Sequence, residues 1–334
     1  MRQGSYNLIV SSSLSISHAF GELEQHRHEL IGYCYRMLGS PFDAEDAVQE
    51  TFTRAWRSRD SFEGRSAMRS WLYRIATNVC LDTLKNKDRR VRPLDLGPAC
   101  EPIEANLNMP AEVHWLEPIP QALVAPEGDP ADVAIAHESI RLAFVAALQH
   151  LPARQRAVLI LREVLTWQAA EVAELLEMSL PAVNSALQRA RATLAKSNLS
   201  PDGPSQPLSE SERSLLDRYV AAFERYDLSA LTALIQKDAR QSMPPYDMWL
   251  RGRDDILTWW FGPGIACRGS RVIPTISANG QPTFGQYKPD PGGGYEPWAL
   301  QVLELSEGRI GEFTFFLDTA RLFPLFGLPL HLDA

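Results

Sequence analysis

WQAAEVAELLEMSLPAVNSALQRARATL, residues 167–194, decides the fold of the second helical part of this chain. Its apolar residues recur at helical spacing on both sides of the turn Glu177-Met178-Ser179, which predicts two helices joined by three residues. Pro181 is acceptable near the start of the second helix, because the first N–H groups of a helix have no partner within it. The spacing is typical of a helix-turn-helix, but it also fits two packed helices of an ordinary bundle.

In a helix-turn-helix, the second helix enters the major groove of DNA with its first residues at the base edges. We therefore expect the polar side chains near its start to contact bases and its arginines to contact phosphates. The candidates are Ser179, Asn184, Ser185, Gln188, Arg189 and Arg191. In the bundle alternative these side chains would only be solvated.

The stretch FEGRSAMRSWLYRIATNVCLDTL, residues 62–84, interleaves arginines with aromatic residues. Arginine suits phosphate, aromatic rings suit stacking on unpaired bases, and an amide can read the polar edge of a flipped base. The best candidates for such contacts are Arg65, Arg69 and Asn78. Four other residues have the spacing of a helix core, and we expect them to be buried: Trp71, Leu72, Ile75 and Val79.

Charge is unevenly distributed along the 334 residues. The net charge of −8 by itself argues against nucleic-acid binding. However, residues 1–93 hold 14 Lys and Arg against 11 Asp and Glu, whereas residues 94–136 hold eight carboxylates and no basic residue. The charge pattern therefore indicates mildly basic helical parts that are joined by an acidic segment.

Composition favours a protein of a reducing, cytoplasmic compartment without a metal site. The four cysteines are scattered without a CxxC pair, so we expect free thiols and no zinc ligand set. No stretch approaches the roughly 18 to 20 apolar residues of a membrane span. Residues 1–21 lack a continuous apolar core, so we interpret them as a flexible leader and not as a signal peptide.

The remaining pattern outlines further elements. LIGYCYRML predicts a helix that stops at Gly39-Ser40-Pro41, and Asp43 is the expected cap of the next helix, AEDAVQETFTRAWRS. AMRSWLYRIATNVCLDTLKNKDRR, HESIRLAFVAALQHL and ARQRAVLILREVL are also expected to be helical. Prolines recur from residue 93 to 130, which predicts an extended connector.

After residue 210 the pattern changes to helices followed by strands. LLDRYVAAFERYD, LSALTALIQKDA and the stretch around GRDDILTWWF predict helices. RVIPTISA, PTFGQYKP, PWALQVLEL and RIGEFTFFLD predict strands, the last two joined by a hairpin turn at Ser306–Arg309. This order indicates an α+β domain.

YRMLGSPFDAEDAVQETFTRAWRSRDSFEGRSAMRSWLYRIATNVCLDTL closely resembles region 2 of extracytoplasmic-function (ECF) sigma factors of bacterial RNA polymerase. LQHLPARQRAVLILREVLTWQAAEVAELLEMSLPAVNSALQRARATL resembles their region 4. The resemblance implies that the protein binds core polymerase and promoter DNA, and that it is no enzyme and needs no cofactor.

The resemblance also implies roles for single residues. DAEDAVQETFTRAW looks like the helix that binds the clamp helices of the β′ subunit, with Asp46, Gln49, Glu50 and Arg54 as contacts. Residues of the loop Phe62–Ser66, including Arg65, and Arg69 and Asn78 would capture the −10 strand. Region 4 would read the −35 element near the β flap.

The C-terminal part resembles the SnoaL-like domains of the nuclear transport factor 2-like superfamily, which implies a cone-shaped α+β barrel. Its cavity could be lined by Tyr246, Asp247, Trp249, Trp260 and Trp298, although we favour the alternative that these aromatics fill the core of the sheet. We expect a regulatory role through an intramolecular contact or a small-molecule ligand. A helix-turn-helix regulator with a ligand-binding domain, and a protein with an active SnoaL-like enzyme domain, are the alternatives.

The connector occupies the place of the sigma linker, which in this family threads through the active-site cleft and RNA exit channel of the polymerase. Within it, AEVHWLEPIPQALV (111–124) carries Trp115 and Pro118, which we expect to anchor the segment in polymerase or on the chain's own C-terminal domain. The expected divisions of this multidomain chain are 1–21 (leader), 22–92 (region 2), 93–130 (linker), 131–197 (region 4), 198–212 (second linker) and 213–334 (SnoaL-like domain).

Overall fold

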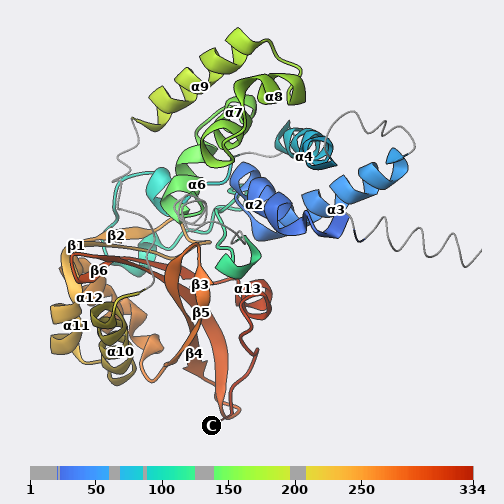
Figure 1. Ribbon diagram of the computed structural model, residues 1–334. Coiled ribbons are helices and arrows are strands. Elements are labelled where there is room, and N and C mark those ends of the chain that lie inside the picture. Colours follow the sequence, from blue (N-terminus) through green and yellow to red (C-terminus); the bar gives the residue numbers. More distant parts are fainter. Residues whose placement is uncertain are drawn as a thin grey trace, which may run out of the picture. The chain divides into compact units, whose positions relative to one another are not determined.

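The computed structural model describes residues 21, 23–59, 68–85, 89–124, 139–195 and 208–333 (Figure 1). The chain divides into two compact units, each assembled from separate segments. The first is Met1–Lys87, Leu123–Ala136 and Ala147–Leu199, and the second is Asp88–Ala122, His137–Ala146 and Ser200–Ala334. None of the described helices is long and apolar enough to cross a membrane.

In the part of the first unit that the structure describes, the regular elements are helices, as expected. They are α2 (Arg27–Leu38), α3 (Pro41–Arg57), α4 (Met68–Lys85), the end of α6 (Leu142–Gln149), α7 (Ala153–Leu159) with a π-helical continuation (Ile160–Val164), α8 (Ala169–Leu175) and α9 (Leu180–Leu194). Helix α6 is shorter than the expected helix, because residues 139–141 form a turn before it.

The cap of α3 differs from the expectation. Ser40 is the residue before the helix, and its hydroxyl accepts the N–H of Asp43 at 3.2 Å. Gly39 closes α2 in the left-handed conformation, with φ of 74°, so that the chain turns directly into this cap. Asp43 lies within the first turn, where its charge is favourable beside the positive end of the helix.

In its described residues after 207, the second unit contains a mixed sheet and four α-helices. The strands are β1 (Ile235–Ser242), β2 (Trp249–Arg251), β3 (Arg271–Ala278), β4 (Gln281–Pro289), β5 (Tyr295–Ser306) and β6 (Arg309–Phe316), and their order is β2-β1-β6-β5-β4-β3. The helices are α10 (Glu210–Arg225), α11 (Leu228–Leu234), α12 (Arg253–Phe261) and α13 (Thr319–Leu325). The expected α+β domain is confirmed, but its sheet is not closed into a barrel: β2 and β3 are its two edges.

Strand β1 replaces the second half of an expected helix. Helix α11 ends at Leu234, and the next residue already belongs to β1, which pairs parallel to β6 and antiparallel to β2. The hydrogen bonds of two neighbouring strands thus override a local sequence that fits either structure. The expected hairpin between β5 and β6 is confirmed, with Glu307 and Gly308 both at positive φ.

One face of the sheet packs against helices α10, α11 and α12, as Figure 1 shows. The indole of Trp260 lies edge-on to the rings of Phe223 and Phe313, at 5.3 and 5.2 Å between centroids. Buried among these rings, the Tyr219 hydroxyl donates to Gln301 at 2.8 Å, and burial raises its pKa well above the ordinary value. Aromatic side chains therefore form much of this core.

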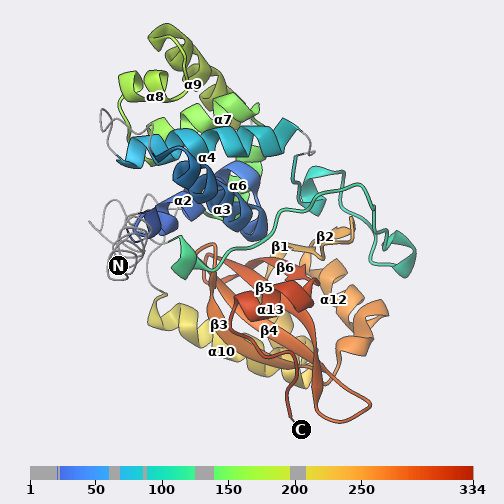
Figure 2. The same cartoon turned by 90° about the vertical axis from the view of Figure 1, so that its right-hand side faces the viewer.

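The expected connector, 93–130, belongs to the second unit up to Ala122, together with residues 89–92 before it, and this segment runs along the sheet of that unit (Figure 2). Three short 3-10 helices occur in it or at its end, at Pro93–Asp95, Glu104–Asn106 and Gln121–Leu123. We call residues 89–122 the docked linker. Its contacts with the sheet domain form the first part of the site described below.

Candidate functional site

The main attachment of the docked linker is a reciprocal pair of hydrogen bonds with Asn279. The N–H of Ile119 donates to Asn279 Oδ1 at 3.0 Å, and the N–H of Asn279 donates to the Ile119 carbonyl at 3.0 Å. The Asn279 amide also donates to the Ile140 carbonyl at 2.5 Å. Pro120 continues the pairing as a bridge to Ala278 at the end of β3. The linker thus adds a short strand-like contact to the β3–β4 hairpin.

Asn279 and Gly280 form the two-residue turn of that hairpin, with φ of 53° and 77°. Both values suit the mirror-image turn that Asn-Gly favours. The dipeptide Asn279-Gly280 is therefore a sequence signal for this hairpin, which the sequence analysis did not predict. It contained no local signal for the partner, because Ile119 lies 160 residues earlier in the chain.

A second attachment joins the linker to the loop and strand around β2. The N–H of Cys100 donates to the Trp249 carbonyl at 2.8 Å, and the Trp249 indole donates to the Gly97 carbonyl at 3.0 Å. The N–H of Asp247 donates to the Asn108 carbonyl at 3.0 Å. Trp249 and Asp247, expected in a ligand cavity, thus meet the linker here.

The contacts of the Trp115 backbone lie within the docked linker itself. Its carbonyl accepts the Arg90 guanidinium at 2.6 Å, and its side chain is half-buried. The fully covered apolar side chains are its neighbours Leu116 and Ile119, at 2% and 0% exposed, with Pro118 also buried between them. Two other linker residues, Cys100 and Leu107, pack against the core of the sheet domain.

Charged groups add to the linker contact. Glu117 lies 3.3 Å from Arg321 on α13 and 3.4 Å from Arg90. Arg321 is about half exposed, so screening by water makes its pair with Glu117 weak.

Two carboxylates stand opposite each other on β5 and β6, Glu304 and Glu312. Arg141 reaches Glu304 at 2.9 Å, and Arg240 reaches Glu312 at 2.7 Å. Burial raises the pKa of Glu312, although the positive charges of Arg240 and of Arg92 from the linker oppose this shift. The sheet thus carries a buried carboxylate, Glu312, opposite the half-buried Glu304, and basic residues from three segments lie near this pair.

The other residues expected in a C-terminal cavity lie in different surroundings. The Trp260 indole donates to Gln241 at 2.6 Å inside the core. The Lys288 ammonium lies 2.9 Å from the centre of the Trp298 ring, and burial lowers the pKa of this lysine. Tyr246 is half-buried in the connection between β1 and β2. Among the described residues, no group of three or more His, Cys, Asp or Glu could hold a metal ion.

The expected polymerase contacts lie along one stripe of α3. Asp46 and Gln49 are exposed, and Glu50 and Arg54 are partly exposed. Arg54 pairs with Glu50 at 2.7 Å and with Asp82 of α4 at 3.5 Å. The opposite side of α3, including Ala44, Val48 and Phe52, is buried. The helix therefore presents a stripe of mixed charge to a partner.

Helix α4 carries the described part of the expected −10 site. Asn78 is exposed, and Arg69 donates to Glu29 at 2.7 Å. Phe62, Arg65 and Ser66 lie outside the described residues. Of the four expected core residues, Leu72 and Val79 are buried, whereas Trp71 and Ile75 are only half-buried.

The expected −35 site lies on α9 and its cap. Asn184 and Gln188 are exposed, and Arg189 donates to the Ser185 hydroxyl at 2.7 Å. The Ser179 hydroxyl caps α9 by accepting the Ala182 N–H at 3.3 Å, so it has a structural use of its own.

Arg191, the last of these arginines, is paired with Glu163 of the π-helical turn. Sequence reasoning missed Glu163, since 28 residues separate the two.

Residues 23–90 match the Sigma-70 region 2 family, and residues 141–194 match the Sigma-70 region 4 family. The ECF RNA polymerase sigma factor SigG of Mycobacterium tuberculosis is 47% identical over 310 residues, which cover 92% of this chain and 82% of the relative. SigJ of the same species is 28% identical, over 73% of this chain and 74% of the relative. A crystal structure of M. tuberculosis SigJ aligns with a TM-score of 0.58 at 21% identity, over 93% of this chain and 99% of that one, and it shares the fold.

Proposed function

Because the chain belongs to the ECF RNA polymerase sigma factors, we propose that its C-terminal domain regulates initiation by holding the linker that joins regions 2 and 4. A sigma factor binds core polymerase and directs it to promoters, and the chemistry of transcription remains with the polymerase. The regulation proposed for this chain therefore acts on binding, in the cytoplasm where polymerase works.

We place the polymerase contacts on the α3 stripe of Asp46, Gln49, Glu50 and Arg54, opposite the β′ clamp helices. Support comes from its exposure and from its mixed charge, which suits a protein surface. We assign Arg69 and Asn78 to the −10 strand, together with Phe62, Arg65 and Ser66 on the resemblance alone. We assign the exposed polar residues of α9 to the −35 duplex, near the β flap.

The observation that carries the regulatory proposal is the reciprocal bonding between Ile119 and Asn279. A linker that pairs with the β3–β4 hairpin cannot at the same time lie in a polymerase channel. Docking therefore competes with polymerase for the same segment. Binding of core polymerase to the wild-type chain must first break the docking contacts. A chain whose linker is already released does not spend that free energy, so it should bind core more tightly by the same amount.

The test is reconstitution with purified core polymerase and no other factor. Wild-type protein should support initiation from a promoter, which a helix-turn-helix regulator that does not replace sigma would fail to do. Asn279→Ala should bind core more tightly than wild type, because it weakens docking without altering any residue of the α3 stripe.

The matched control is Asp217→Ala, at an exposed position of α10. If Asn279→Ala and Asp217→Ala bind core with the same affinity as wild type, linker docking is not regulatory. If wild type itself fails to initiate, the chain is not acting as a sigma factor.

A further inference from the structure

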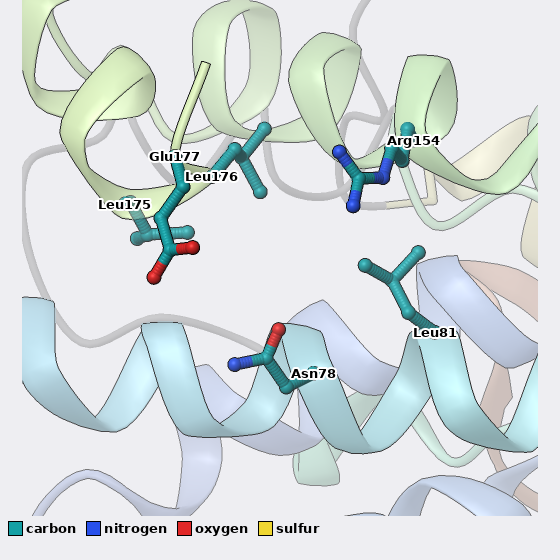
Figure 3. A pocket seen from close by; sticks show the side chains of 6 residues that line it. All are labelled: Asn78, Leu81, Arg154, Leu175, Leu176 and Glu177. Carbon is teal, nitrogen blue, oxygen red and sulfur yellow. The ribbon is translucent and has the colours of Figure 1, made fainter.

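A small cavity lies within the first unit, between α4, α7 and the turn that joins α8 to α9 (Figure 3). Its volume is about 150 Å³. The described residues that line it are Asn78 and Leu81 of α4, Arg154 of α7, Leu175 and Leu176 at the end of α8, and Glu177 of the turn. The contacts described above for polymerase, DNA and the linker do not involve Arg154 or Glu177.

The inner wall of the cavity is apolar. Leu175 and Leu176 are buried, and Leu81 is half-buried. An apolar cavity of about 150 Å³ in another protein holds benzene, so this one has room for a ligand of about six to eight non-hydrogen atoms. A short aliphatic group of such a ligand would be removed from water by contact with the leucines, which is favourable.

The mouth of the cavity is polar and open to solvent. Asn78, Arg154 and Glu177 are all exposed there. In Figure 3 the Glu177 carboxylate and the Arg154 guanidinium approach the space from opposite sides, and the Asn78 amide points into it from α4. The cavity therefore offers a ligand one anion, one cation and one amide beside an apolar wall.

These three polar side chains have no partner among the residues that the structure describes. Glu177 and Arg154 form no ion pair there, with each other or with a neighbour, and the Asn78 amide forms no hydrogen bond there. Two opposite charges that flank one small space favour a molecule that carries both charges, because each end of it meets a charge of the other sign.

Glu177 occupies a position that would suit glycine better. Its φ of 53° lies in the left-handed region, which is unfavourable for a residue with a Cβ atom. The turn of a helix-turn-helix often contains glycine, yet this chain has a charged side chain there. Backbone strain of this kind is concentrated at ligand-binding and other functional sites, so the strain supports a use for the carboxylate.

We propose that this cavity binds a small zwitterionic amino acid with a short aliphatic side chain. The α-carboxylate of the ligand pairs with the Arg154 guanidinium, and its α-ammonium pairs with Glu177 and donates to the carbonyl oxygen of Asn78. Its side chain lies against Leu81 and Leu176. Valine has the required size and groups.

A ligand in this cavity would contact Asn78, which we assign to the −10 strand. Amino acid and DNA would then compete for the same amide, so the ligand would reduce promoter opening. This consequence rests on the proposed function. The binding of the amino acid does not rest on it, because it can be measured on the chain alone.

The test measures binding of L-valine to the full chain by saturation-transfer NMR. Two analogues each lack one charge: valinamide has no carboxylate, and isovalerate has no ammonium group. Wild type should bind valine about tenfold or more tightly than either analogue, because each analogue loses a hydrogen bond between charged groups.

Variants assign each charge to its residue. Arg154→Met should weaken valine and isovalerate about tenfold and leave valinamide unchanged, whereas Glu177→Gln should weaken valine and valinamide and leave isovalerate unchanged. Arg225→Met, at an exposed position of α10, is the control and should bind valine like wild type. Glu177→Gly should lose valine binding although its Tm is no lower than that of wild type, because glycine accepts the backbone angle.

The inference is overturned if wild type does not bind valine at about 10 mM, since the cavity would then hold only water. It is also overturned if either analogue binds as tightly as valine, or if Arg154→Met and Glu177→Gln bind valine like wild type. Failure of the wild-type chain to initiate with core polymerase would instead refute the proposed function, and it would leave these binding results unchanged.

Discussion

Replacing Asn279 by Ala tests how strongly the C-terminal domain holds the linker. The substitution removes both side-chain hydrogen bonds, so the buried N–H of Ile119 and the buried carbonyl of Ile140 lose their partner. A buried polar group left without a partner costs about 1–3 kcal/mol. Alanine at φ of 53° adds about 1 kcal/mol, because the left-handed conformation suits asparagine better.

Undocking returns the Ile119 N–H to water and so relieves about 1–3 kcal/mol, whereas the strain of alanine at φ of 53° stays in the hairpin turn. Undocking of residues around Ile119 should then become roughly 5- to 150-fold more frequent, at roughly 1.4 kcal/mol per tenfold. Native-state hydrogen exchange measures this directly at the Ile119 amide. Asn279→Gly separates the two contributions: its Ile119 amide should exchange as in Asn279→Ala, but the free energy of unfolding should recover by about 1 kcal/mol, since glycine accepts the backbone angle.

An unchanged exchange rate at Ile119 in Asn279→Ala would refute the reasoning, because it would mean that the side-chain bonds do not hold the linker. Equal free energies of unfolding for the Ala and Gly variants would refute only the contribution of the backbone angle. Asp217→Ala should leave the exchange of Ile119 as in wild type.

Three further predictions concern charged groups. The raised pKa of Glu312 means that its charged form opposes folding: the stability it contributes is full below the ordinary value of 4.5 and is lost as pH rises through the folded-state pKa. Glu312→Gln should flatten the dependence of Tm on pH in that window, and an unaltered slope would contradict the assignment. Arg156→Met should lower the free energy of unfolding of the first unit by about 3 kcal/mol in urea titrations, since three carbonyls lose their donor; the exposed Arg154→Met is the control. Glu163→Gln should change stability by less than about 0.5 kcal/mol, yet raise affinity for duplex DNA in anisotropy titrations by freeing Arg191; equal affinity would show that this pair does not restrain it.

Local patterns predicted the helices well. The helix-turn-helix follows from apolar spacing and from the cap residue before Leu180, and the structure has α8, a turn and α9 there. Asn78 was singled out as an amide on an arginine-rich helix, and it is exposed there. These features depend on residues within a few turns of one another, so a single stretch of sequence contains the information.

Features that depend on distant partners could not be predicted in the same way. Strand β1 exists because β6, some 70 residues later, pairs with it, and the open sheet depends on the order of all six strands. The sequence singled out Trp115, whose side chain is half-buried, whereas its neighbours Leu116 and Ile119 are buried. The contact between the Arg69 guanidinium and the Trp167 ring joins regions 2 and 4. The motif of neither region predicts a contact with the other.

The linker and its partner are also separated in time. The ribosome makes Ile119 160 residues before Asn279, which at about 5–20 residues per second is a delay of roughly 8–32 s. During this interval regions 2 and 4 emerge with a linker that has no hairpin to pair with. Each new molecule therefore passes through a stage in which it resembles a shorter sigma factor, and the linker becomes docked only after the last strands are made.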